Sequence, residues 1–254
     1  MADSTPYDFS ALKSSQLTVH TIILTATRTF AQGISAAQRT SPFTTAGEPF
    51  RSSGFLCDAI PYSESSGVAL IGPVLGASAA VLTCESLFSP ALRRVIVCGF
   101  AGGLLTGGHA ISVGDIVIPS VLAGEDGTSW LYGAVEVEQF ISSELHTELV
   151  ARIEELSRQE PHRIHRGGAW TTDAAFLESP AKKKLYSEMG CICVEMELAA
   201  VHQFAKKKSL ECGAAFLISD LLGSNWEGGF RKARISSSFR IICEAVLATA
   251  MTSR

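Results

Sequence analysis

Two glutamates stand inside apolar sequence in the segment CVEMELAAV, residues 193–201. Glu195 and Glu197 are separated by one residue, at the point where a hydrophobic run meets a predicted helix. A buried strand excludes charge and an exposed helix gathers its acids on one face, so neither explains this placement. The two carboxylates can accept hydrogen bonds from free amides at the helix start or from a bound ligand. In isolation, a helix-capping contact is the more ordinary interpretation.

A third acid closes the next apolar run along the chain. The segment AAFLISD, residues 214–220, ends with Ser219 and Asp220. An aspartate at the mouth of a buried strand is partly withdrawn from water, and an acid in that position can donate a proton near neutral pH. The alternative is an aspartate that caps the following loop. Both segments are therefore candidates for acid–base or ligand-binding chemistry.

Short apolar runs rich in β-branched residues predict the strands that must position these acids. Several runs are apolar almost throughout, which is typical of strands covered on both faces. The predicted strands lie at residues 19–25, 67–72, 93–99, 114–119, 190–195 and 212–219.

Helical patterns lie between the predicted strands. Residues 143–158 carry an apolar stripe at helical spacing, and a second helix begins with Ser179 as N-cap and ends at Gly190. A final helix is predicted at 235–251, whereas 35–66 is polar and is expected to be irregular. The alternation predicts one α/β domain over residues 1–254, with a mixed, largely parallel central sheet flanked by helices. Residues 1–16 are expected to form an irregular N-terminal extension.

The composition excludes several functional classes. The chain has 254 residues, 46% of them hydrophobic, and a net charge of −4, so a nucleic-acid partner is not expected. The polar N-terminus and the absence of a long unbroken apolar segment predict a cytoplasmic protein without a membrane partner. The seven cysteines lack a CxxC pair, and His162 and His165 are interpreted as part of an exposed connection. No metal or cofactor is expected.

Two glycine-rich segments follow predicted strands: GPVLGAS at 72–78 and GFAGGLLTGG at 99–108. Glycines in this position let backbone amides approach a ligand closely, although tight turns are the more common explanation. Neither segment matches a dinucleotide fingerprint or a phosphate loop.

The order of the motifs GPVLGAS, CGFAGGL, VGDIVIP, EDGTSWLY, CVEMELAAV and LISD resembles the nucleoside phosphorylase superfamily, which includes purine nucleoside and uridine phosphorylases and methylthioadenosine nucleosidases. The similarity runs from about Gly67 to Asp220, and the N-terminal 60 residues match poorly. It implies cleavage of the N-glycosidic bond between ribose and a nucleobase.

The resemblance implies a role for each acid. Glu197 would accept hydrogen bonds from the ribose 2′ and 3′ hydroxyls, Met196 would pack against the sugar, and Glu195 would support the helix start. Asp220 would protonate N7 of the leaving base, which favours a purine-type substrate. Further candidates for contact with the substrate are Ser219, Gly76, Phe100, Ala101, Gly102 and, in the segment TTDAAFLES, Thr172, Asp173 and Phe176. A strand followed by a cap is an equally good interpretation of the last three.

The sequence departs from the family pattern where phosphate would bind. Val97 stands in place of an arginine and Phe100 in place of a hydroxyl residue, and an apolar pair cannot hold a dianion. Arg28 and Arg51 are the remaining candidates for phosphate. Hydrolytic relatives use a glutamate after the first strand, and residues 25–31 contain none.

These observations favour hydrolysis of a purine-type nucleoside. One alternative is phosphorolysis with phosphate held by Arg28 and Arg51, and another is a catalytically silent relative that binds or stores a nucleoside. A small-molecule nucleoside, with or without phosphate, is the expected partner. A homo-oligomer is also expected, because sites in the family often borrow residues from a neighbouring subunit.

Overall fold

The structure is a computed structural model of the chain. It describes residues 19–40, 51–56, 60–105, 110–134, 136–140, 143–158, 163–223, 225–229 and 233–252, and only the backbone of 51–64. The extension expected at residues 1–16 lies outside this described part. Among the helices that are described, none combines the length and the apolar character needed to cross a membrane.

The described elements alternate between strands and helices along the chain. The strands are β1 (Thr21–Leu24), β2 (Arg51–Leu56), β3 (Ile60–Ser65), β4 (Val68–Ile71), β5 (Arg94–Leu104), β6 (Ile116–Glu125), β7 (Val137–Gln139), β8 (Ile164–Thr172), β9 (Cys191–Glu195), β10 (Glu211–Leu222) and β11 (Trp226–Gly228). The helices are α1 (Arg28–Thr40), α2 (Ala77–Leu87), α3 (Gly127–Leu131), α4 (Glu144–Ser157), α5 (Pro180–Glu188), α6 (Leu198–Lys208) and α7 (Ala233–Met251), with a 3₁₀ turn η2 at Ala175–Leu177.

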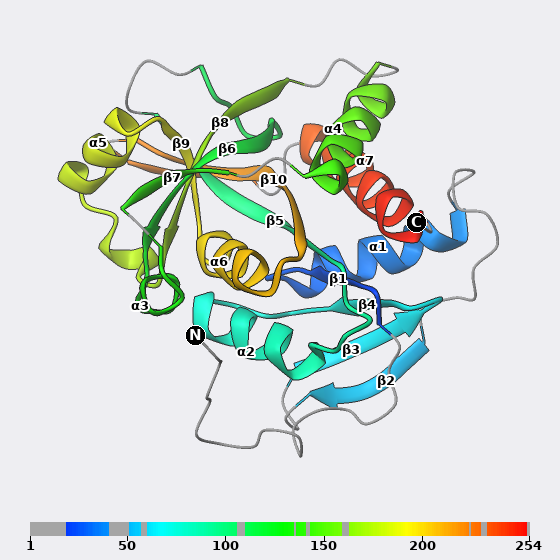
Figure 1. Ribbon diagram of the computed structural model, residues 1–254. Coiled ribbons are helices and arrows are strands. Elements are labelled where there is room, and N and C mark those ends of the chain that lie inside the picture. Colours follow the sequence, from blue (N-terminus) through cyan, green and yellow to red (C-terminus); the bar gives the residue numbers. More distant parts are fainter. Residues whose placement is uncertain are drawn as a thin grey trace.

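The sheet closes on itself at one end. Strand β10 pairs with β5 along one edge and with β6 along the other, and the order continues from β6 through β8 and β9 back to β5. From β5 the sheet extends outward through β1, β4, β3 and β2 (Figure 1). The ladders β5–β10 and β6–β8 are parallel, while β10–β6 and β5–β9 are antiparallel. The predicted mixed α/β sheet is therefore confirmed.

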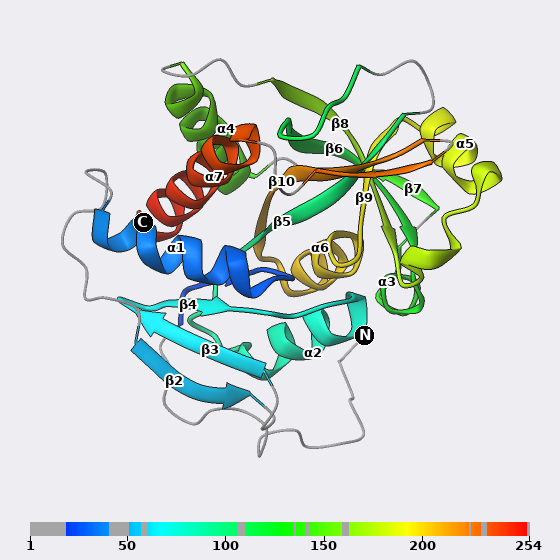
Figure 2. The ribbon, with the colours of Figure 1, turned by 180° about the vertical axis from the view of Figure 1, so that it is seen from behind.

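The helices form two groups around the sheet. Helices α1, α4 and α7 pack together on one side, and α2, α3 and α6 pack together on the other, as both ribbon views show (Figures 1 and 2). Helix α5 lies apart from both groups, near β9. The ring of strands thus has helices on its outside.

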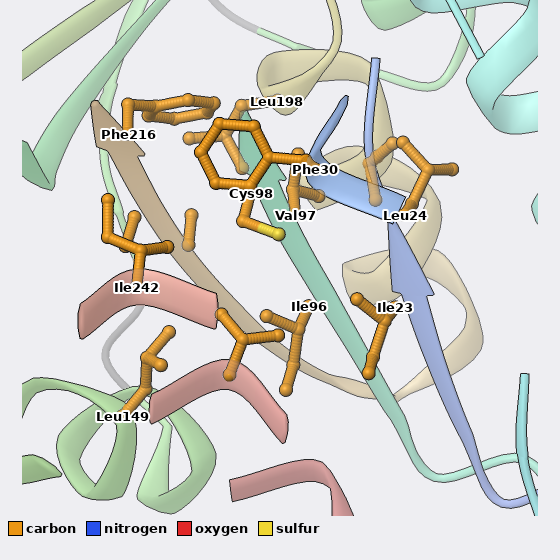
Figure 3. Packing of buried hydrophobic residues seen from close by; sticks show 14 of the residues in the cluster. Ile23, Leu24, Phe30, Ile96, Val97, Cys98, Leu149, Leu198, Phe216 and Ile242 are labelled. Atoms are coloured by element: carbon orange, nitrogen blue, oxygen red, sulfur yellow. The ribbon is translucent and has the colours of Figure 1, made fainter. Parts of the chain in front are cut away.

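The core explains why the apolar runs form strands. Ile23 and Leu24 of β1 pack beside Ile96 and Val97 of β5, with residues from α4 and α7 closing over them (Figure 3). All four of these side chains are buried. Burial of apolar area at about 25 cal/mol per Å² is the main stabilising contribution, so strands covered on both faces carry almost no polar residues.

All six predicted strands and all three predicted helices are present. Ser143 and Ser179 cap α4 and α5, accepting hydrogen bonds from the amides of His146 and Lys182. Their hydroxyls satisfy amides that have no partner within the helix.

The expectation of irregular structure at 35–66 is wrong. Helix α1 continues to Thr40, and β2 and β3 form an antiparallel hairpin within the same stretch. Glycine in a helix is unfavourable by itself, but a Cβ at Gly33 would collide with Phe239 and Cys243 of α7. Close packing against α7 therefore accounts for Gly33 and outweighs its poor helix propensity.

The exposed connection expected around His165 is also wrong. Residues 164–172 form β8, in the middle of the ring. His165 lies 2.8 Å from the buried carboxylate of Asp115, measured from Nε2 to Oδ2. His162 lies outside the described residues.

Candidate active site

A cavity of about 600 Å³ opens beside the ring of strands. Its walls come from the segment after β1, from the middle of β5, from the end of β9, from β10 and from the start of α7. The lining residues are Ala26, Thr27, Thr29, Leu75, Phe100, Ala101, Gly102, Ala175, Glu178, Val194, Glu195, Met196, Glu197, Ser219, Asp220, Leu222, Ile235, Ser236 and Phe239. The size suits a small organic ligand.

Glu195 holds the start of α6 in place. Its Oε2 accepts hydrogen bonds from the amides of Glu197 (2.8 Å) and Leu198 (2.7 Å). Its Oε1 accepts from the hydroxyl of Thr171 on β8, and that hydroxyl in turn accepts from the amide of Ala199 at 2.9 Å. The capping contact expected for Glu195 is therefore present, and Thr171 is a second contributor that the sequence did not reveal. A carboxylate at this end of a helix also interacts favourably with the helix dipole.

Glu197 is fixed by a glycine from a distant part of the chain. Its Oε1 accepts a 2.8 Å hydrogen bond from the amide of Gly76, which precedes α2. Gly76 has a φ of 92°, a conformation that side-chain-bearing residues rarely adopt. Glu197 is 4% exposed and lines the cavity. Gly76 thus aims a backbone N–H at Glu197 and orients its carboxylate.

Burial changes the acidity of both glutamates. Loss of hydration raises the pKa of Glu195, and its three hydrogen-bond donors oppose that rise. Burial also raises the pKa of Glu197, and the negative charge of Glu195 raises it further. Because Glu197 receives fewer donors, we infer that it is the first of the two to take up a proton as the pH falls.

Asp220 lies at an irregular point of β10. The β5–β10 register shifts between Ile218 and Asp220, so that Ser219 and Asp220 both line the cavity. The hydroxyl of Ser219 lies 2.6 Å from Asp220 Oδ1, and the indole N–H of Trp226 donates to Oδ2 at 2.8 Å. Trp226 belongs to the short strand β11, which pairs with the end of β10.

Glu178 is a site residue that sequence reasoning missed. It follows η2, is half-buried and lines the same cavity as Asp220. Burial raises the pKa of Glu178 from its ordinary value of 4.5 to about 7, the charge of Asp220 adds to the rise, and Lys183 opposes it. Glu178 belongs to the segment TTDAAFLES, where contacts with the substrate were expected, but it was not itself singled out, because only the fold brings it to the same cavity as Asp220. We call Glu178, Glu195, Glu197 and Asp220 the carboxylate end of the cavity.

The other end of the cavity is aromatic. The ring centroids of Phe100 and Phe239 lie 6.5 Å apart in a stacked arrangement, and Phe30 makes edge contacts with both at 4.8 Å. Thr27 and Thr29 complete this wall. Val97 is 1% exposed and points into the core with its neighbours in β5 (Figure 3). We call Phe100, Phe239, Thr27 and Thr29 the aromatic end.

Some of the predicted site residues line the cavity, and others lie around it. Met196, Ala101 and Gly102 line it, as do Phe100, Ser219 and the acids Glu195, Glu197 and Asp220. Gly76 reaches it through the hydrogen bond to Glu197.

The three residues singled out in the segment after β8 do not line the cavity, and their contact with a base stays a prediction. Thr172 is buried, with its hydroxyl 3.4 Å from Glu125 Oε2, and Asp173 is exposed with its Oδ2 3.4 Å from the amide of Gly127. Phe176 is fully exposed. None of these three lines the cavity within the described part of the chain; Ala175 and Glu178 do so instead.

The two arginines expected near phosphate are not among the described lining residues. Arg28 begins α1 and is exposed, although its neighbours Thr27 and Thr29 line the aromatic end. Arg51 begins β2, and its side chain lies outside the described residues.

Three solved structures share the fold of this chain. The purine nucleoside phosphorylase of Toxoplasma gondii, solved with immucillin-H, aligns with a TM-score of 0.70 at 11% identity, over 91% of this chain and 90% of that one. The futalosine hydrolase of Helicobacter pylori aligns at 0.66 and 19%, over 91% and 98%. The 5′-methylthioadenosine/S-adenosyl homocysteine nucleosidase of Campylobacter jejuni aligns at 0.67 and 18%, over 91% and 98%. At these identities the similarity concerns the fold alone.

Sequence comparison identifies the family. The chain is 29% identical to the guanosine phosphorylase of Halorubrum lacusprofundi over 155 residues, which is 61% of each chain, so the match spans less than two thirds of that relative. A family model described as the phosphorylase superfamily matches residues 58–248, which is most of the chain and includes every acid of the carboxylate end. The resemblance drawn from the motifs is thereby confirmed: the chain belongs to the phosphorylase superfamily.

Proposed function

We propose that the protein hydrolyses the N-glycosidic bond of a purine-type nucleoside. The observation that carries the proposal is the contrast between the two ends of the cavity. Four acids line the cavity, Glu195 and Glu197 buried and Glu178 and Asp220 half-buried, and a phenylalanine pair lines it where relatives that use phosphate would need a cation and a hydroxyl. Family membership supports cleavage of a nucleoside but not the choice between water and phosphate.

In this proposal the carboxylate of Glu197 holds the ribose. Its Oε1 accepts the amide of Gly76, and the amide of Met196 also donates to the carboxylate, whose remaining lone pairs accept hydrogen bonds from the 2′ and 3′ hydroxyls. As the glycosidic bond breaks, positive charge develops on the sugar. A carboxylate beside the sugar stabilises that charge more strongly in a buried site than in water.

Asp220 acts at the base in this proposal. A neutral purine leaves as an anion unless it receives a proton, and an acid within reach of N7 supplies one. The contacts of Asp220 with Ser219 and Trp226 fix the direction of its carboxyl group. Glu178, on the same side of the cavity, adds a second ionisable group next to the base.

Water is favoured over phosphate because the aromatic end offers no positive charge. Among the described residues that line the cavity, none is Lys, Arg or His. A phosphate dianion placed between two phenylalanines and four carboxyl groups would lose its hydration without gaining an ion pair.

Phosphorolysis is the second candidate, because the relative with 29% identity is named a guanosine phosphorylase. In that case Arg28, which begins α1 beside the lining threonines, and Arg51 would hold phosphate. Either reaction would use the same carboxylate end.

We also propose that the protein is a homo-oligomer. Leu75 belongs to the cavity wall and yet is 64% exposed, and Phe176 and Leu177 are exposed next to the lining residues Ala175 and Glu178. Apolar side chains gathered at the rim of a site are typical of surfaces that another subunit covers. Measurement of the molar mass in solution by light scattering tests this proposal.

One experiment distinguishes the reactions. The purified protein is incubated with guanosine, inosine, adenosine, methylthioadenosine and uridine in ¹⁸O-water, with and without phosphate, and the sugar product is analysed by mass spectrometry. Hydrolysis predicts free ribose labelled with ¹⁸O at C1 at a rate that phosphate does not change. Ribose 1-phosphate, formed only when phosphate is present, would instead establish phosphorolysis.

A further inference from the structure

A fully buried carboxylate lies outside the cavity, in the turn that leads into β6. The Oδ2 of Asp115 accepts hydrogen bonds from the amide of Ser112 at 2.9 Å and from Nε2 of His165 at 2.8 Å. Its Oδ1 lies 3.5 Å from Nη2 of Arg234. We call these four residues the Asp115 cluster. Of the described residues that line the cavity, none belongs to this cluster, so the proposed function gives it no role.

The partners of Asp115 come from more elements than a turn requires. An aspartate that only closes a turn accepts from an amide of that turn, as Asp115 does from Ser112. His165 belongs to β8, and Arg234 belongs to the first turn of α7. A carboxylate removed from water is costly unless polar partners surround it, and the directed contacts fix the elements that supply those partners. Asp115 therefore ties the start of β6 to β8 and to α7.

The backbone of the same turn holds β10 just before its irregular point. The amide of Ile218 donates to the carbonyl of Asp115 at 2.9 Å, and the amide of Gly114 donates to the carbonyl of Ile218 at 2.9 Å. The β5–β10 register shifts immediately after Ile218, and Ser219 and Asp220 then border the cavity. A displacement of the turn would therefore displace the residue from which the chain leads directly to Asp220.

Helix α7 packs on this turn through further contacts. Gly114 has a φ of 89°, and a Cβ at this position would lie 3.0 Å from Cγ of Arg234. The buried hydroxyl of Ser238, one helical turn further along α7, donates to the carbonyl of Gly114 at 2.6 Å. The same part of α7 contributes Ile235 and Phe239 to the cavity wall. The turn is therefore in contact with two of the elements that form the cavity, β10 and α7.

We propose that Asp115 is a positioning residue for the reaction and that it acts through Asp220. The Asp115 cluster holds the turn at 112–115 against β8 and α7, and the turn holds Ile218. The position of Ile218 in turn sets the direction in which Asp220 meets the base. The inference rests on the proposed function, because Asp220 is the proton donor only in that proposal.

Loss of this positioning should affect proton transfer more than binding of the ribose. Proton transfer requires the donor to lie within hydrogen-bond distance of the base and in line with it, so a small displacement of the donor lowers the rate steeply. The proposed ribose contact is Glu197, whose Oε1 is held by the amide of Gly76, and neither residue belongs to the Asp115 cluster. Removal of the charge of Asp115 should therefore lower kcat and leave KM nearly unchanged.

The test compares guanosine with 7-methylguanosine, whose base carries a methyl group at N7 and leaves as a neutral molecule without a proton. The variant is Asp115→Asn, which keeps the shape of the side chain and removes its charge. The matched control is Glu154→Gln, which breaks the exposed ion pair of Arg166, next to His165 in β8. We expect kcat for guanosine to fall by about tenfold or more in Asp115→Asn, and kcat for 7-methylguanosine by less than about threefold. The control should change neither value.

Substitutions of His165 repeat the test at the edge of the cluster, where a change threatens folding less than at Asp115. His165→Phe removes the hydrogen-bond donor to Asp115, whereas His165→Gln keeps one. We expect the ratio of kcat for guanosine to kcat for 7-methylguanosine to fall in His165→Phe and to be restored in His165→Gln. This ratio does not depend on how much of a variant is folded, so a merely structural role would leave it unchanged.

A double variant shows whether Asp115 acts through Asp220. Addition of Asp115→Asn to Asp220→Asn should cause no further loss with guanosine, because the proton donor is already absent. Equal losses for the two nucleosides in Asp115→Asn and His165→Phe, or losses that multiply in the double variant, would overturn the inference while cleavage of guanosine upheld the proposed function. If the original protein cleaves neither nucleoside, the proposed function falls, and this inference with it.

Discussion

The side chains at the two ends of the cavity are held by different kinds of interaction, although the strand residues that form these ends are only a few positions apart. At the carboxylate end, Glu195, Glu197 and Asp220 are each held by hydrogen bonds from other elements. At the aromatic end, Phe100 and Phe239 are held by packing against Phe30. Hydrogen bonds fix direction, which acid–base chemistry requires, whereas packing fixes only shape and excludes ions.

The difference indicates which half of the site is committed to a chemical role. The network at Glu195 involves Thr171 of β8, the start of α6 and, through Glu197, the loop before α2. Such a network of buried polar groups is costly unless each member has partners. The aromatic end has no comparable requirement, so its residues can define which substrates enter without taking part in proton transfer.

The substitution with the largest expected effect on activity is at Asp220, the residue proposed to protonate the base. Asp220→Asn keeps the shape of the side chain but cannot donate the proton, so we expect kcat/KM for guanosine to fall by about 10²–10⁴. Steady-state assays of base release measure this change. The control is Glu188→Gln, which removes an exposed carboxylate at the end of α5, outside the cavity, and should have less than a twofold effect. An equal loss in Glu188→Gln would mean that the change of charge, and not the loss of a proton donor at the base, causes the effect.

The next largest effect on activity is expected for a substitution of Glu197, the residue proposed to hold the ribose. Glu197→Gln keeps an oxygen that can accept the amide of Gly76 but removes the charge that faces the ribose, and we expect kcat/KM to fall by about 10- to 100-fold. The contrast between ribosides and 2′-deoxyribosides sharpens the prediction, because the variant should discriminate less between them. Unchanged discrimination would place the ribose hydroxyls elsewhere.

The carboxylate end should also determine how stability depends on pH. The pKa of Glu178 is raised from 4.5 to about 7, and those of Glu195 and Glu197 are raised in the same direction. Between the ordinary and the raised pKa the folded protein binds more protons than the unfolded chain, so the free energy of unfolding should decrease as the pH rises through this window. Urea denaturation at pH 5, 6, 7 and 8 measures the slope, which Glu197→Gln should reduce. A slope of opposite sign would show that other groups dominate.

The smallest effect is expected when the aromatic end is opened. Phe100→Ser restores a hydroxyl but adds no positive charge, so we expect phosphate to leave the rate unchanged. Loss of the contacts with Phe30 and Phe239 should reduce the free energy of unfolding by about 2 kcal/mol. Assays with 0 and 50 mM phosphate and thermal unfolding are the measurements. A clear acceleration by phosphate would mean that steric exclusion by Phe100 alone separates the two reactions.

The elements whose signals lie within a short stretch of sequence could be predicted. The strands β1, β4, β5, β6, β9 and β10 were predictable because each is an apolar run bounded by turn residues. Helix α4 was predictable from its apolar stripe at helical spacing, and α5 from its serine cap. Helix α1 and strand β8 were missed because their interiors contain Gly33 and the pair Gly167–Gly168. A Cβ at Gly168 would approach the backbone of Cys191 to 2.8 Å, so close packing accounts for this glycine, and packing partners are not visible in the sequence.

The same limit applies to the site. The motif around Glu197 and the segment ending at Asp220 could be recognised because each is continuous in sequence. Phe239 comes from a segment without a motif, and Glu178 lies in the segment TTDAAFLES without having been singled out there; both reach the cavity only through the fold. The segment after β8 was expected to contribute Phe176, but the residues that line the cavity are Ala175 and Glu178, since η2 leaves Phe176 facing solvent.

The irregularity at Ser219 has a consequence for how this site can change. Successive residues of a regular strand point to opposite faces, and the shift in register is what allows Ser219 and Asp220 to border the same space. Deletion of one residue here would turn Asp220 to the other side of the sheet. A substitution would leave the side chain at this position pointing into the cavity. Lineages that diverge from this protein and keep its reaction should therefore keep both Asp220 and the number of residues between Ile218 and β11.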